Sequence, residues 1–184
     1  MSEEVLTHAD LVELARRWLL RRHPIVCTEL SNGSGEDPDA IGWRGGVSTL
    51  IECKVSASDY HSDKQKYFRK HSNLGCGDYR YFMTPSGLIK NYALIPAGWG
   101  LLEVTGKTKI RKTKQPTLFS VVNKSKELII MASALRRVGQ LCPKGVSVKA
   151  YYLHTSDRAS LSIDIDDLEP EIADLREATN DAKD

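Results

Sequence analysis

Several features that would place this chain in a specialised class are scarce or missing. Its four cysteines are widely scattered, and no two of them form a CxxC pair. This spacing argues against a disulfide framework and against a cysteine-based zinc site. No apolar run approaches the roughly 18 residues that span a bilayer. The N-terminal stretch MSEEVLTHADL is acidic and lacks the apolar core of a signal peptide. We therefore expect a cytoplasmic protein without a membrane partner.

The composition is that of an ordinary folded protein. The chain has 184 residues, of which 41% are hydrophobic and 27% charged, enough for one domain with a real core. The net charge of +2 hides an asymmetry. Residues 164–184 hold nine acidic and two basic side chains, a net −7, so residues 1–163 hold 24 basic and 15 acidic ones, a net +9. A basic body with an acidic tail over residues 161–184 is compatible with binding a polyanion.

Hydrophobic periodicity and turn residues predict one α/β domain over residues 1–160. A helix capped by Thr7 runs to about residue 22, and strands are expected at 25–30, 39–43 and 47–55. A second helix begins near residue 58 and ends near 71, and a strand follows at 79–84. The order is therefore αβββαβ. Additions follow at 101–104 (strand), 125–140 (helix) and 146–153 (strand). In the 125–140 helix the residues expected to face the core are Leu128, Met131, Ala132 and Leu135.

The strand at 47–55 carries two charged side chains on one face. Alternation directs Ile51 and Cys53 to one side, and Glu52 and Lys54 to the other. The hairpin at Gly45-Gly46 can bring Asp39 beside Glu52. Two adjacent carboxylates raise each other's pKa unless a cation lies between them. Mg²⁺ commonly takes one or two protein carboxylates, and a nearby lysine can orient a water or meet a phosphate.

These groups are the ones that metal-assisted phosphodiester hydrolysis requires. The spacing alone leaves a second interpretation open, in which Glu52 and Lys54 form a simple ion pair and Asp39 is an ordinary hairpin carboxylate. We interpret the face that Glu52 and Lys54 share as a catalytic floor rather than part of the core.

A family resemblance favours the catalytic interpretation. Pro38-Asp39, followed thirteen residues later by Glu52-Cys53-Lys54, resembles the PD-(D/E)XK nuclease superfamily. The blocks IECKVSASDYHSDKQKYFR, GDYRYFMTPSGLI and LIPAGWGLLEV resemble the MmcB-like DNA-repair endonucleases and related phage proteins, over roughly residues 5–115. The resemblance implies a restriction-endonuclease-like core, with a mixed central sheet flanked by helices. It also implies dependence on Mg²⁺ or Mn²⁺ and a DNA substrate.

The same resemblance suggests roles for individual residues. Asp39 and Glu52 become metal ligands, Lys54 the catalytic lysine, and the backbone carbonyl of Cys53 a further ligand. Possible supporting residues are Glu13, Gln65 and Asp59. The alternatives are that Glu13 is a surface carboxylate, that Ser56 and Asp59 only cap a helix, and that Asp37 takes the place of Asp39, although the motif fits Asp39 better.

Two basic segments are candidates for contacts with DNA phosphates. Their members are Lys64, Lys66, Arg69 and Lys70 in the first, and Lys107, Lys109, Arg111, Lys112 and Lys114 in the second. The alternatives are a solvated face and a sheet edge that lysines protect from aggregation. The sequence therefore predicts a Mg²⁺- or Mn²⁺-dependent deoxyribonuclease in DNA repair, recombination or phage DNA processing. The alternative is a nuclease-fold module that binds DNA or a protein. A homodimer is compatible with either function.

Overall fold

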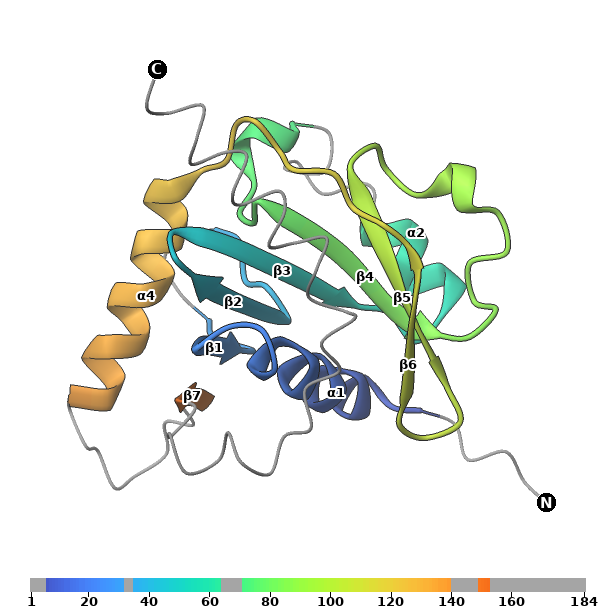
Figure 1. Ribbon diagram of the computed structural model, residues 1–184, viewed down its shortest axis with the longest axis horizontal. Coiled ribbons are helices and arrows are strands. Elements are labelled where there is room, and N and C mark those ends of the chain that lie inside the picture. Colours follow the sequence, from blue (N-terminus) through green and yellow to red (C-terminus); the bar gives the residue numbers. More distant parts are fainter. Residues whose placement is uncertain (1–5, 32–34, 64–70, 140–148, 153–184) are drawn as a thin grey trace. The chain divides into compact units, whose positions relative to one another are not determined.

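The computed structural model of the chain describes residues 6–31, 35–63, 71–139 and 149–152 (Figure 1). The chain divides into two units, Met1–Tyr152 and Leu153–Asp184, and every described residue belongs to the first. The predicted tail at 161–184 lies outside the described residues, so the boundary expected at residue 160 stays a prediction. Within the described residues, no helix is both long and apolar enough to cross a membrane.

The first unit has a mixed α/β fold built on one sheet. The helices are α1 (His8–Leu20), α2 (Ala57–Asp63) and α4 (Lys124–Gly139), with short 3₁₀ turns at Ser72–Leu74 and Tyr92–Leu94. The strands are β1 (Ile25–Thr28), β2 (Ala40–Arg44), β3 (Val47–Cys53), β4 (Tyr79–Pro85), β5 (Trp99–Thr105), β6 (Lys109–Lys114) and β7 (Lys149–Tyr152). The predicted order αβββαβ is present from α1 to β4.

The sheet combines parallel and antiparallel pairs in the order β6-β5-β4-β3-β2-β1-β7. β3, β4 and β5 are parallel neighbours, whereas the other pairs are antiparallel. Local signals account for the first elements. Thr7 and Asp10 form a reciprocal capping box at the start of α1. Gly45 and Gly46 both adopt positive φ, as the tight β2–β3 hairpin requires.

The core has one layer on each face of the sheet. On one face, α1 packs Leu11, Ala15 and Trp18 against strand residues that include Ile51 and Cys53. On the other face, side chains from α2 and α4 pack against the sheet. In Figure 1, α1 and α2 lie on opposite sides of the sheet. The predicted alternation along β3 is confirmed, because Ile51 and Cys53 join the layer under α1 whereas Leu50, of the same parity as Glu52, joins the other layer.

The predicted orientation of the helix at 125–140 is wrong. Three residues expected to face the core are exposed: Leu128, Ala132 and Leu135. Ile130 and Ala134 are buried instead, and Met131 is only half-buried against the core. The reason is a buried carboxylate on the same helix, Glu127, which is hydrogen-bonded to the sheet. A polar anchor of this kind overrides the hydrophobic pattern, because a buried carboxylate cannot give up its donors without a large penalty.

Candidate functional site

The topology gathers several chain segments at one edge of the sheet, which we call the carboxyl edge. It comprises the ends of the parallel strands β3, β4 and β5 and the starts of the antiparallel strands β2 and β6. Asp39 directly precedes β2, and Lys54 directly follows β3. The β5–β6 turn carries Lys107. Ligand sites commonly form at the carboxyl ends of parallel strands in open α/β sheets.

Asp39 is fixed at this edge by the backbone of β3. Its Oδ2 accepts a hydrogen bond from the Cys53 amide at 2.7 Å, and its carboxylate remains 19% exposed. Nε2 of His8, at the start of α1, lies 3.5 Å from the other oxygen, Oδ1. Burial and the charge of Glu52 raise the pKa of Asp39 to about 6, although the Cys53 amide, Lys54 and His8 act in the opposite direction. Additional positive charge at this point would therefore favour the ionised form.

His8 was not recognised from the sequence. A single histidine beside a helix cap has no spacing pattern that marks it, and only the fold brings α1 against the start of β2. Its ring faces Asp39 and remains partly exposed. His8 is therefore a member of the site that sequence reasoning missed.

Glu52 and Lys54 share a face, as predicted, but both side chains are buried. Nζ of Lys54 lies 3.3 Å from Oε2 of Glu52, 3.4 Å from Oδ1 of Asp63 and 4.0 Å from Oδ1 of Asp59. Burial lowers the pKa of Lys54, but the surrounding carboxylates outweigh this effect and raise the pKa above its ordinary value. The ammonium therefore stays charged. The side chains of Lys54 and Glu52 are 6% and 2% exposed, so they form a buried network rather than an open floor.

The helix α2 closes this network. The hydroxyl of Ser56 accepts a hydrogen bond from the Asp59 amide at 3.1 Å, so the helix-cap interpretation of Ser56 is confirmed. The half-exposed Asp59 and the buried Asp63 of this helix bring their carboxylates within 4.0 Å of the Lys54 ammonium. Asp63 received no role from sequence reasoning, yet its carboxylate is one of the closest to Lys54.

The site offers few oxygen atoms that could bind a metal ion, which suits a cation that needs few protein ligands. Among residues 6–31, 35–63, 71–139 and 149–152, no three His, Cys, Asp or Glu side chains form a metal-binding cluster. Mg²⁺ is commonly held by one or two carboxylates together with waters and substrate oxygens. The amide and carbonyl of one residue in an extended strand point to the same side, so the Cys53 carbonyl at the end of β3 points to the side of its amide, which donates to Asp39. Asp39, Glu52 and this carbonyl are oxygen donors of the type that such an ion takes.

Other predicted residues occupy different surroundings. Glu13 accepts a hydrogen bond from Nε of Arg16 at 2.7 Å and lines a surface pocket of about 400 Å³ between α1 and the β5–β6 turn. Asp37 is exposed, which favours Asp39 as the residue of the Pro-Asp motif that reaches the site. Gln65 and the first basic segment, Lys64, Lys66, Arg69 and Lys70, lie outside the described residues.

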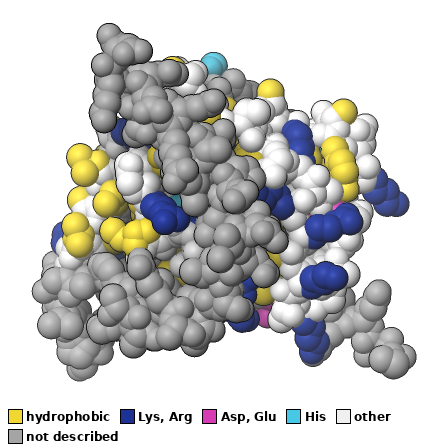
Figure 2. Space-filling model, in the orientation of Figure 1, with side chains coloured by type: hydrophobic (Ala, Val, Ile, Leu, Met, Phe, Trp, Pro, Cys, Tyr) yellow, Lys and Arg dark blue, Asp and Glu magenta, His cyan; other side chains and the backbone are white. Residues whose placement is uncertain are grey.

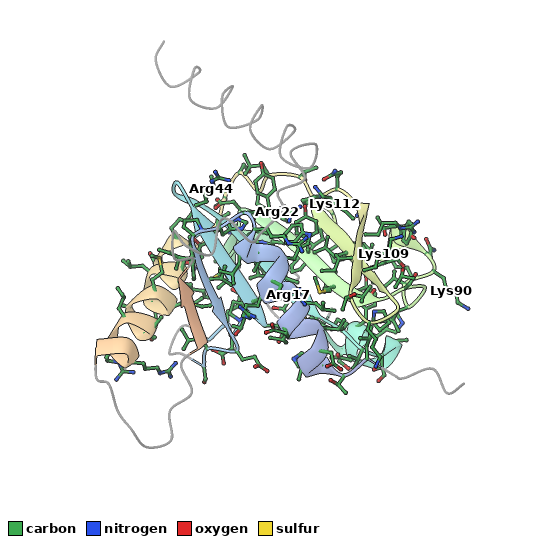
Figure 3. All side chains as sticks on the ribbon, turned by 60° about the horizontal axis from the view of Figure 1, so that its bottom comes forward. Arg17, Arg22, Arg44, Lys90, Lys109 and Lys112 are labelled. Atoms are coloured by element: carbon green, nitrogen blue, oxygen red, sulfur yellow. The ribbon has the colours of Figure 1, made fainter. Side chains whose placement is uncertain are left out.

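The second basic segment forms an edge of the sheet. Lys107 lies in the turn before β6, and Lys109 and Arg111 are exposed on that strand, while Lys112 and Lys114 are half-buried. Figure 2 shows basic side chains gathered over this side of the molecule, and Figure 3 labels Lys109 and Lys112 on β6. Arg111 lies 3.4 Å from the buried carboxylate of Glu103. The position fits both DNA contact and protection of a sheet edge.

Comparison with known proteins identifies a shared fold. No protein-family model and no curated protein matches the chain. A solved structure, the SPO1766 protein of unknown function from Silicibacter pomeroyi, is similar with a TM-score of 0.53. The two share 20% sequence identity, and the similarity covers 74% of this chain and 90% of that chain. The similarity shows a common mixed α/β fold.

Proposed function

We propose that the protein is a metal-dependent DNA nuclease of the PD-(D/E)XK type, which hydrolyses phosphodiester bonds in DNA repair, recombination or phage DNA processing. A restriction-endonuclease-like core is part of this proposal. One observation carries it: the Asp39 carboxylate is held against the end of β3, beside Glu52 and Lys54. These are the three residues of the sequence motif, and they come together at the carboxyl edge of the sheet.

Each residue of the site has a separate role in this proposed reaction. Asp39, Glu52 and the Cys53 carbonyl would hold Mg²⁺ or Mn²⁺, which when bound polarises the phosphate and lowers the pKa of a coordinated water. Lys54 presents a charged ammonium that stabilises the extra negative charge as the water oxygen bonds to phosphorus and the bond to the leaving oxygen breaks. Lys107 and Lys109 can bind backbone phosphates nearby.

The direct test is cleavage of duplex, single-stranded and branched DNA by the full chain, with Mg²⁺, Mn²⁺ or EDTA. We expect cleavage with metal, none with EDTA, and a loss of at least about 100-fold in Asp39→Asn. Asp37→Asn is the matched control, because Asp37 is two residues away and exposed. Cleavage that survives in Asp39→Asn would reject the assigned site. The absence of cleavage on every substrate with either metal would reject the activity.

Metal binding can be measured separately from cleavage. Calorimetry with Mn²⁺ should detect one or two sites in the wild type and none in Asp39→Ala, whereas Asp37→Ala should bind as the wild type does. Unchanged binding in Asp39→Ala would place the ion elsewhere.

A second candidate is a nuclease-fold module that binds DNA or protein without cutting. The observation in its favour is the buried network, in which Lys54 is close to Glu52 and Asp63 rather than open to a substrate. If the protein is such a module, it should bind DNA without metal and cleave it under no condition. The variants Lys54→Met and Asp39→Asn should then bind DNA as tightly as the wild type.

A further inference from the structure

The exposed apolar surface of the protein is concentrated in one stretch of chain. Among the described residues, seven large hydrophobic side chains are exposed, and five of them fall between residues 118 and 135. These five are Leu118, Val121, Leu128, Ile129 and Leu135. In Figure 2 the apolar side chains gather on the side of the molecule where Figure 1 draws α4. Contiguous exposed apolar surface commonly marks an interaction site.

The orientation of α4 is imposed by a buried carboxylate. Oε1 of Glu127 accepts hydrogen bonds from the Ser48 hydroxyl at 2.7 Å and the Gly77 amide at 2.9 Å. Its Oε2 accepts one from the Trp43 ring at 3.1 Å and one from Lys124 at 3.2 Å. Turning the helix to bury its leucines would withdraw this carboxylate from these donors. The exposure of the leucines is therefore a consequence of how α4 is attached to the sheet.

The exposed side of α4 has the form of a helix-binding surface. Leu128, Ala132 and Leu135 follow each other at i, i+4 and i+7, and Ile129 lies beside them. We call these four residues the α4 apolar face. This spacing produces a continuous row along one side of a helix. The small Ala132 between the two leucines leaves room for a side chain from a second helix to enter.

The charged side chains that α4 exposes are basic. Glu127 is the single acidic residue of α4, and it is buried. The basic residues Lys124, Lys126 and Arg137 are engaged with Asp78, Glu36 and the Ser31 carbonyl, respectively. Arg136 is exposed, lies on the same side as the apolar face, and makes no hydrogen bond or ion pair with the described residues. A carboxylate is the group that a guanidinium pairs with most strongly.

We propose that the α4 apolar face binds an acidic amphipathic helix of another protein. The apolar row of that helix packs along Leu128, Ala132 and Leu135, and one of its carboxylates pairs with Arg136. A partner of this kind matches both the helical spacing and the charge. The surface is distinct from the carboxyl edge, so the proposal does not depend on nuclease activity.

Other occupants match the face less well. A second copy of α4 brings apolar residues but no exposed carboxylate for Arg136, because Glu127 is buried in its own network. An anionic lipid surface attracts clusters of several basic side chains, each contributing about 1 kcal/mol. Here three of the four basic residues of α4 already have partners within the chain.

The test uses two synthetic helical peptides of about 18 residues, long enough to form a helix. Both carry leucine at i, i+4, i+7 and i+11, and the flanking positions hold glutamate in one peptide and lysine in the other. Binding to the full chain is followed by fluorescence anisotropy. The glutamate peptide should bind, and the lysine peptide should bind at least tenfold more weakly. Leu135→Ser should weaken binding of the glutamate peptide at least tenfold, and Arg136→Glu should reverse the preference between the peptides.

Leu94→Ser is the matched control, because Leu94 is an exposed leucine outside α4. It should leave the affinity unchanged. Equal affinity for both peptides, or full affinity in Leu135→Ser, would overturn the proposal. A dimer in sedimentation that Leu135→Ser dissociates would assign the face to a second copy. Binding to anionic vesicles that Leu135→Ser abolishes would assign it to lipid. Peptide binding that appears only in a chain shortened after residue 160 would assign it to the acidic segment of this chain.

Discussion

Lys54 is a charged residue whose side chain is buried. Its ammonium lies within 4.0 Å of carboxylates from Glu52, Asp59 and Asp63. A buried charge of this kind is tolerated because its partners are close, and removing one partner leaves the others without compensation. The same residue therefore affects both stability and, under the proposed function, catalysis.

We predict that Lys54→Met destabilises the fold by about 3 kcal/mol, because Glu52 and Asp63 then remain buried without a counter-charge. Adding Asp63→Asn should recover part of this loss, so the two substitutions should be clearly non-additive in urea unfolding. Strictly additive losses would contradict the network. Cleavage by Lys54→Met should fall at least about 100-fold when measured on folded protein. Cleavage at the wild-type rate would show that the lysine is not catalytic.

His23 should make stability depend on pH. Burial lowers its pKa from 6.5 to about 4, despite a hydrogen bond to the Leu19 carbonyl that acts in the opposite direction. The unfolded chain therefore gains a proton as the pH falls through 6.5, whereas the folded chain does so only near pH 4. The stabilisation is complete above pH 6.5 and is lost between pH 6.5 and 4. At about 1.36 kcal/mol per pKa unit, the loss is about 3 kcal/mol.

The measurement is chemical unfolding at pH 7.5 and pH 4.5. In His23→Gln the difference in unfolding free energy between pH 7.5 and pH 4.5 should shrink by about 2.5 kcal/mol, since pH 4.5 is still above the folded-state pKa. His61→Gln is a suitable control, because His61 is an exposed histidine on α2 that makes no contact with His23. An identical pH dependence in His23→Gln and wild type would mean that other groups account for it.

At the scale of elements, β6 is the strand at one end of the sheet formed by the described residues. Lysines on an open edge prevent pairing with another chain, and the same lysines neutralise phosphates when DNA binds. The structure puts Lys109 and Lys112 on this strand and Lys107 in the turn that precedes it. Arg111 on the same strand lies 3.4 Å from the Glu103 carboxylate.

We predict that glutamine at Lys107, Lys109 and Lys112 weakens binding to duplex DNA of any sequence. Each phosphate that the protein no longer neutralises should flatten the slope of log K against log salt by about 0.9, so removing all three lysines should flatten it by up to about 2.7. Arg136→Gln, an exposed cation on α4, should leave the slope unchanged. If the lysines only protect the edge of the sheet, the slope of log K against log salt should not change. The triple variant should then self-associate more than the wild type.

On the scale of the whole molecule, the main feature is the separation of charge along the sequence. Residues 1–163 carry a net +9 and residues 164–184 a net −7. Basic side chains that attract DNA also attract an acidic segment. A segment on the same chain has a high effective concentration near those side chains, because it is tethered to them. The sequence leaves two roles open for the acidic segment: competition with DNA, or increased solubility alone.

Deleting residues 161–184 should distinguish the two. Competition predicts tighter DNA binding and faster cleavage at low salt. The gain should fade as salt shortens the screening length to about 8 Å near physiological strength. Affinity and rate that are unchanged at every salt concentration would exclude competition.

Most element boundaries of the described region follow from local signals in the sequence. The cap at Thr7, the glycines at 45 and 46 and the alternation along β3 each depend on neighbouring residues, so they are readable without the fold. The same locality explains why Glu52 and Lys54 could be placed on one face, and why Asp39 could be placed across the hairpin from them. The hairpin leaves little freedom in their relative positions.

The surroundings of these residues were decided by the tertiary structure. The contact of His8 with Asp39, the role of Asp63 beside Lys54 and the burial of Lys54 all depend on elements that meet only in the folded chain. The orientation of α4 is the clearest case, since hydrophobic spacing favoured a core position for Leu128 and Leu135, yet they are 67% and 61% exposed. The spacing of hydrophobic residues in the sequence shows which side of a helix is more apolar. The hydrogen bonds of Glu127 to Ser48, Gly77 and Trp43 determine which side faces the sheet, because a helix turned the other way would leave these buried donors without their acceptor.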